Sequence, residues 1–168
     1  MNQKALMLLL VVAAVIFPAS AGAKAEAHDE LTITLAPPLV FGDPTPDCAQ
    51  GTATFDLHST AGAGFGSVCF LTSSPVTPCP EDACTILSDV LEFQLPGGTI
   101  TTSSVQSEID SFDPSSGNFT IELEFEGQVT QATHRFHNLG GDLFDGNGAT
   151  VFGSDGTVSP NITFVIHD

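Results

Sequence analysis

The residues best suited to chemistry in this chain are two histidines and an arginine in the run His134-Arg135-Phe136-His137. Arg135 is the last basic residue of a chain that has twenty acidic ones, so its placement is expected to matter. A guanidinium beside an imidazole can orient an anionic or carbonyl-bearing ligand. We expect a strand here, with Arg135 and His137 on one face and His134 on the other. The competing interpretation is that Arg135 pairs with acidic residues on the surface.

A glycine-rich stretch further along the chain is a candidate calcium site. It holds three oxygen-bearing side chains, those of Asp142, Asp145 and Asn147. Calcium takes about six to eight oxygen ligands from carboxylates, amides and carbonyls. The EF-hand spacing is absent, and Asp-Gly and Asn-Gly are also ordinary turn dipeptides. We therefore expect a loop at this place, with calcium as the one cofactor that the sequence suggests.

Paired carboxylates are a third possibility, because Glu122, Glu124 and Glu126 share one face of a strand. Glycosidases use two carboxyl groups, but the chain has no Trp or Tyr on which a sugar could stack. These glutamates are expected to form a solvent face. No Gly-x-Ser-x-Gly elbow and no phosphate-binding loop is present, so catalytic residues stay unassigned and a non-enzymatic role is favoured.

The four cysteines predict two disulfides. An even number of cysteines in an exported chain is typical of disulfide bonding, and three pairings are possible. We favour Cys48–Cys69 and Cys79–Cys84, the second of which closes a short loop. The spacing lacks the paired Cys-x-x-Cys units of a zinc site, which is the competing interpretation. Residues 36–50 and 73–84 are rich in proline and are expected to be irregular connections pinned by these bonds.

Alternation of apolar and polar residues predicts the secondary structure. A period of two is typical of half-buried antiparallel strands. The runs that show it are 31–35, 53–58, 91–95, 119–126 and 162–167. Pro96-Gly97-Gly98 predicts a tight hairpin, and glycine-rich turns separate the other runs. We expect an all-β fold made of one antiparallel β-barrel, with a β-sandwich as the alternative.

The N-terminus predicts export. Lys4 precedes an apolar stretch from Ala5 to Phe17, and small residues follow, which is the layout of a helical signal peptide. The stretch is shorter than the ~20 residues that a membrane span requires. Cleavage after Ala23 or after Ala25 fits equally well. Residues 1–25 are thus expected to be the signal and residues 26–168 a single acidic β-domain, secreted or periplasmic, without a stable membrane span.

The charge restricts the partners. The formal net charge of the full chain is −17, and such a surface repels phosphate backbones and anionic lipids. Nucleic acid is therefore excluded as a partner. The thirteen phenylalanines carry no polar group, so most of them are expected to fill a core. A small-molecule ligand remains the partner that the composition allows, and the oligomeric state stays open.

The later strands resemble those of secreted bacterial β-proteins. The resemblance covers residues 50–168 and rests on Gly-Thr-rich segments such as 95–101, 127–140 and 155–166. This layout is similar to the allene oxide cyclase and dirigent-type barrels, which are eight-stranded and antiparallel with a lumen. The resemblance implies a barrel that could hold a small ligand in its lumen. No catalytic motif of either family maps onto this chain.

Together these observations predict an exported β-barrel with a phenylalanine-rich, charge-poor interior that binds a small apolar or amphipathic ligand without chemistry of its own. Arg135, His134 and His137 are the candidate ligand-binding residues. Two alternatives remain, a lumen enzyme of cyclase or isomerase type and a surface protein that binds divalent cations.

Overall fold

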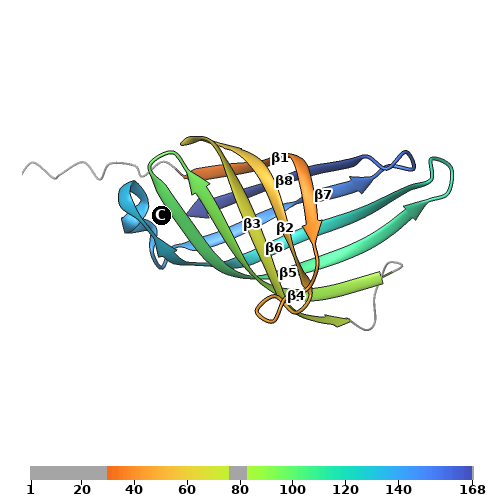
Figure 1. Ribbon diagram of the computed structural model, residues 1–168, viewed down its shortest axis with the longest axis horizontal. Coiled ribbons are helices and arrows are strands. Elements are labelled where there is room, and N and C mark those ends of the chain that lie inside the picture. Colours follow the sequence, from red (N-terminus) through yellow and green to blue (C-terminus); the bar gives the residue numbers. More distant parts are fainter. Residues whose placement is uncertain (1–29, 76–82, 168) are drawn as a thin grey trace, which may run out of the picture.

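The alternating segments of the chain build a closed β-barrel (Figure 1). The computed structural model describes residues 30–75 and 83–167. Eight antiparallel strands follow one another around the barrel, and the last pairs with the first. The strands are β1 (Leu31–Gly42), β2 (Gly51–Ser59), β3 (Gly62–Pro75), β4 (Ala83–Leu95), β5 (Gly98–Asp113), β6 (Asn118–Ala132), β7 (Leu143–Phe152) and β8 (Val158–His167). The predicted all-β barrel is confirmed, and the sandwich alternative is wrong.

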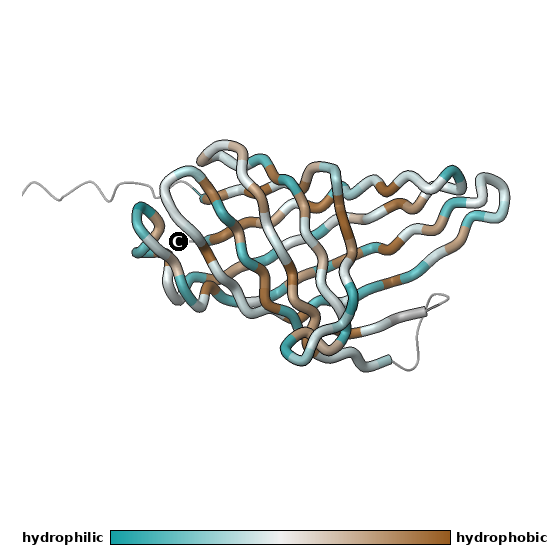
Figure 2. The backbone as a smooth tube through the Cα atoms, in the orientation of Figure 1, coloured by the Kyte–Doolittle hydropathy of each residue, from teal (hydrophilic) through white to brown (hydrophobic). Residues whose placement is uncertain are grey.

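The period of two in the sequence determines which side chains enter the barrel. In β6, Leu123 and Phe125 are buried, whereas Glu122, Glu124 and Glu126 are exposed on the outer face. Figure 2 shows apolar and polar residues alternating along several of the other strands. The glutamates therefore form the expected solvent face.

One half of the barrel is packed with aromatic rings. The ring of Phe164 lies 5.0 to 5.4 Å, between centroids, from those of Phe93, Phe125 and Phe144. Phe164 is 1% exposed, and Gly146 stands directly opposite it on β7. A Cβ atom at Gly146 would collide with the Phe164 ring. Glycine is therefore required at this position if the ring is to lie over strand β7. This half of the lumen is closed.

The other half is open because β1 bends away from β8. The pairing of β1 with β8 runs only from Leu31–Ile166 to Thr34–Thr163. A register shift in β1 between Ala36 and Leu39, at Pro37 and Pro38, turns the second half of the strand across the barrel (Figure 1). The β5–β6 and β7–β8 hairpins project beyond this point. The expectation that residues 36–50 are irregular is thus wrong for 36–42, which continue the strand.

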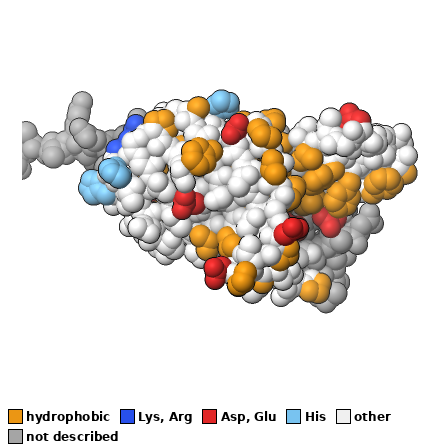
Figure 3. All heavy atoms as spheres, in the orientation of Figure 1, with side chains coloured by type: hydrophobic (Ala, Val, Ile, Leu, Met, Phe, Trp, Pro, Cys, Tyr) orange, Lys and Arg blue, Asp and Glu red, His pale blue; other side chains and the backbone are white. Residues whose placement is uncertain are grey.

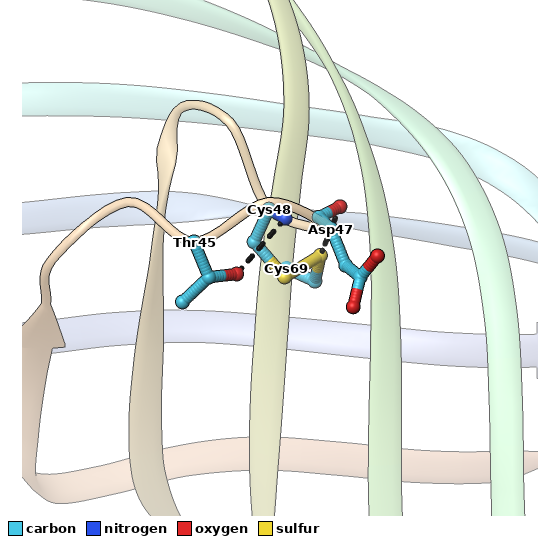
Figure 4. The surroundings of a disulfide bond; sticks show 4 residues. All are labelled: Thr45, Asp47, Cys48 and Cys69. Carbon is cyan, nitrogen blue, oxygen red and sulfur yellow. Dashed lines mark hydrogen bonds between the residues drawn. A yellow bond between two sulfur atoms is a disulfide. The ribbon is translucent and has the colours of Figure 1, made fainter.

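The connection after β1 is tied to β3 by the predicted disulfide Cys48–Cys69 (Figure 4). Its Cα atoms are 5.1 Å apart, and the Cys48 amide donates a hydrogen bond of 3.1 Å to the Thr45 hydroxyl. The second expected pair, Cys79–Cys84, stays a prediction, because Cys79 lies outside the described residues. The irregular connection expected over 73–84 is wrong at both ends, where 73–75 belong to β3 and 83–84 to β4.

Two further expectations are corrected. The run from His134 to His137 is part of a 3-10 helix, η1 (His134–Leu139), because the chain leaves β6 at Ala132 and His134 takes a positive φ of 54°. The expected calcium loop is mostly strand, since β7 begins at Leu143. No helix within the described ranges is long and apolar enough to cross a membrane.

Candidate ligand pocket and lumen carboxylates

The open half of the barrel contains a pocket with a cavity of about 70 Å³. Phe55, Phe125 and Phe164 line the pocket on the side of the closed half, and they also belong to the hydrophobic core. Most of its walls are apolar as well. The polar side chains that line it are those of Gln106, Glu108 and Thr150. A pocket of this kind can enclose the apolar part of a small ligand and still offer a few groups for recognition.

A rim of exposed and half-buried phenylalanines lies beside the mouth of the pocket. Phe112, Phe119 and Phe152 stand opposite one another on β5, β6 and β7. From the other side, β1 brings the Phe41 ring to 6.0 Å from that of Phe152. Phe41 is 52% exposed and Phe112 is 56% exposed. Figure 3 shows hydrophobic side chains gathered at the projecting end of the molecule. Such an exposed apolar patch is typical of a binding site.

A line of polar side chains runs along the inner face of β5 toward this mouth. It contains Thr102, Ser104, Gln106 and Glu108, of which the first three are buried. The Ser104 hydroxyl donates a hydrogen bond to the carboxylate of Asp89, which faces it from β4. The Gln106 side-chain amide donates to Glu108 Oε1 over 2.5 Å. Asp89 on β4 and Glu108 on β5 therefore place carboxyl groups in the lumen on two neighbouring strands.

Burial controls the ionisation of both groups. It raises the pKa of Asp89 to about 7, against the opposing hydrogen bond from Ser104 and with a smaller contribution from the charge of Glu108. Burial and then the negative charge of Asp110 also raise the pKa of Glu108, and the hydrogen bond from Gln106 opposes them. The charge-poor interior that the sequence predicts thus has an exception, because Asp89 is 0% exposed within the core.

Several polar atoms in the lumen are buried without a hydrogen-bond partner. In the described part of the chain these include Thr150 Oγ1, Asp110 Oδ1 and Asp89 Oδ2. Thr150 is 2% exposed and lines the pocket. An unsatisfied buried polar group costs about 1–3 kcal/mol. The pocket thus offers hydrogen-bonding capacity that the protein itself does not use.

The candidate ligand-binding residues of the sequence lie at the opposite end of the barrel. His134, Arg135 and His137 are all exposed on η1. The Arg135 guanidinium lies 5.0 Å from the centre of the Phe136 ring and donates to the Pro96 carbonyl over 3.4 Å. These side chains do not enter the lumen. The enzyme alternative thereby loses Arg135 and His134 as candidates, and Glu108 is the titratable group that lines the pocket.

The candidate calcium ligands lie in two different environments. Asp145 and Asn147 are exposed on the outer face of β7, beside Glu126 and Glu124 of β6. Asp142 precedes β7, and its Oδ2 atom is buried without a partner in the part of the chain that the structure describes. Among the described residues, no group of three or more His, Cys, Asp and Glu side chains is placed to hold a metal ion.

Asp145 instead bonds to a histidine. His167 Nε2 lies 3.0 Å from Asp145 Oδ1, and His167 Nδ1 lies 3.2 Å from Glu30 Oε1. An imidazole donates from both nitrogens only when it is protonated. The hydrogen bond to Asp145 is the main cause that raises the pKa of His167. This contact stabilises the fold below the unfolded-state pKa of the histidine and is lost as the pH rises through the folded-state pKa.

Asp145→Asn is therefore expected to lower the pKa of His167, because the asparagine keeps the shape but loses the negative charge. The measurement is an NMR titration of the imidazole protons. Asp56→Asn, an exposed change on the outer face of β2, is the control and is expected to leave the midpoint of His167 unchanged. An unchanged midpoint in Asp145→Asn would contradict the contact.

Comparison of the chain with protein-family models, with curated proteins and with solved structures finds no match. The fold and the pocket therefore carry the functional argument.

Sequence reasoning missed Asp89, Ser104 and Glu108. A signal was present, because the two-residue turn at Pro96 and Gly97 sets the register of β4 against β5. Counting back from that turn places Ser104 opposite Asp89, on the same face as the buried Leu91 and Phe93.

Proposed function

We propose that this protein is an exported, non-catalytic binder that holds a small apolar or amphipathic ligand in the open half of its barrel. The observation that carries the proposal is the apolar pocket, which is lined at its mouth by the exposed Phe41 and the half-buried Phe152. The ligand would place one part on the floor of Phe55, Phe125 and Phe164 and another part against the rim. The enclosed volume is small, so the rim would supply much of the contact area.

Export is supported by the signal-like N-terminus and by the Cys48–Cys69 disulfide, since disulfides persist in oxidising compartments. The strongly acidic composition would keep a barrel with an apolar mouth from associating with other copies. Both features suit a carrier that works outside the cytoplasm.

The first test is binding of N-phenyl-1-naphthylamine, an uncharged dye that becomes fluorescent in apolar surroundings. The chain has no Trp or Tyr, so the dye signal has little background. We expect saturable binding, and we expect Phe41→Ser to weaken it about tenfold, because half a phenylalanine side chain is worth roughly 1.4 kcal/mol of burial.

Phe65→Ser is the matched control, because Phe65 is 54% exposed but points outward from β3. Its dye affinity should equal that of the unchanged protein. If the two variants bind equally well, or if the dye does not saturate, the pocket is not the binding site.

A further inference from the structure

The pocket that we propose as the binding site has an acidic side chain in its wall. Glu108 lies on the inner face of β5 and lines the pocket together with Gln106. The Gln106 amide donates to Glu108 Oε1, so the second carboxylate oxygen remains to accept a hydrogen bond. Asp110 follows on the same face, and its buried Oδ1 atom has no partner among the described residues. This wall is rich in acceptors.

A second strand adds an independent hydrogen-bonding group. Thr150 enters the pocket from β7, and its hydroxyl is buried without a partner within the described residues. Buried polar groups in native proteins are nearly always satisfied by protein, water or ligand. The free hydroxyl on one wall and the carboxylate on another therefore point to a ligand group with several donors.

Within the described residues, no Lys or Arg side chain neutralises this wall. Arg135 is the only Lys or Arg within residues 30–75 and 83–167, and it lies on η1 at the far end of β5. A carboxylate in apolar surroundings is costly unless it is paired. A ligand that brings a positive charge would remove that cost, whereas an anionic ligand would increase it.

We propose that the pocket selects ligands whose apolar body ends in a primary ammonium group, which donates hydrogen bonds to the Glu108 carboxylate and the Thr150 hydroxyl. This inference rests on the proposed function, since it names the class of ligand for the same pocket. An ammonium has three donors and a full charge, so it matches an acceptor-rich wall better than an alcohol does.

The test is displacement of N-phenyl-1-naphthylamine by octylamine, octanol and octyltrimethylammonium at about pH 8, where a primary alkylamine is still protonated. The three compounds share one alkyl chain. Octylamine is expected to bind at least about tenfold more tightly than octanol, the gain typical of a charge-assisted hydrogen bond. Octyltrimethylammonium, which has the charge but no N–H group, should bind about tenfold more weakly than octylamine.

Glu108→Gln is expected to reduce the affinity for octylamine to that of the unchanged protein for octanol. Thr150→Val, which keeps the side-chain shape, should weaken octylamine several-fold. Glu92→Gln is the matched control. On the outer face of β4, Gln94 donates to Glu92 over 2.8 Å, so the same pair of residue types occurs outside the barrel. This control should bind octylamine as the unchanged protein does.

The outcomes separate the two proposals. If dye and octanol bind but octylamine is no tighter, ammonium selection is wrong and the proposed function stands. If the dye does not bind, the proposed function falls, and this inference falls with it. If octyltrimethylammonium equals octylamine, or if Glu92→Gln weakens octylamine as much as Glu108→Gln does, the preference reflects overall charge and the assignment to Glu108 and Thr150 is overturned.

Discussion

Asp89→Asn is expected to remove a fall in stability that the unchanged protein shows between about pH 4 and pH 7. The folded-state pKa of Asp89 is about 7, whereas an exposed aspartate titrates at 3.8. Between these values the unfolded chain releases a proton that the folded barrel keeps, so the free energy of unfolding decreases as the pH rises. Over this range the difference between the two proteins should change by about 4 kcal/mol in favour of the variant.

The measurement is urea unfolding followed by far-ultraviolet circular dichroism at several pH values. Asp113→Asn is the control of opposite sign. Hydrogen bonds from Ser115 and Ser116 lower the pKa of Asp113 to about 2, so its contribution is present above an ordinary aspartate pKa and is lost as the pH falls. Parallel stability curves for Asp89→Asn and the unchanged protein would show that Asp89 ionises normally, contrary to its burial.

Phe164→Ala is expected to destabilise the barrel by about 3–5 kcal/mol, the range for a fully buried phenylalanine. The ring is stacked on Phe144 and meets Phe93 and Phe125, so its loss leaves a cavity between three rings. Because β-strands hold these neighbours in place, the cavity cannot easily collapse. The urea midpoint should fall without a change in the slope of the transition, since the surface exposed on unfolding stays similar.

Phe65→Ala serves as the control because its ring is on the outer face of β3. A change there is expected to stay within about 0.5 kcal/mol. A loss at Phe164 as small as the one expected at Phe65 would mean that the rings of the closed half contribute little to stability. A second variant tests the same packing. Gly146→Ala should also destabilise the barrel, because the added Cβ atom would force the Phe164 ring from its place.

Much of the fold could be predicted from the sequence because strand alternation is a local signal. The Phe119–Glu126 pattern and the turn at Pro96 and Gly97 were sufficient to place β6 and the β4–β5 hairpin. The closure of the barrel has no such local signal in the sequence. Whether β8 returns to β1 depends on the pairing of Leu31 with Ile166, which are far apart in the chain.

Glycine misled the prediction for β7. Asp145, Gly146, Asn147 and Gly148 look like turn residues, yet they form a strand. Gly146 lies under the Phe164 ring, and a Cβ atom at Gly148 would collide with the carbonyl oxygen of Asn161 on β8. Both glycines are there for tertiary reasons, because the neighbouring strand approaches too closely for a side chain. No local pattern distinguishes such a glycine from one in a turn.

The candidate site was missed for a related reason. The inner face of β5 is made of Ser, Thr and Gln side chains and not of apolar ones. Alternation alone therefore does not show which face of that strand is inside. The hairpin register supplies the answer only when it is combined with the apolar face of β4. The His134–His137 run was misplaced because it follows β6 directly and contains no glycine or proline to mark the end of the strand.

The pairing of β1 with β8 ends at Thr34, and this has a consequence for the association of the protein with other chains. Beyond Thr34, the described part of β1 has no strand on its β8 side, so the barrel carries a short free edge of the kind that can recruit a strand from another molecule. Pro37 and Pro38 lie on this stretch, and neither has an N–H group to offer. Together with the register shift beside them, they make this edge a poor template for strand addition and amyloid-like growth.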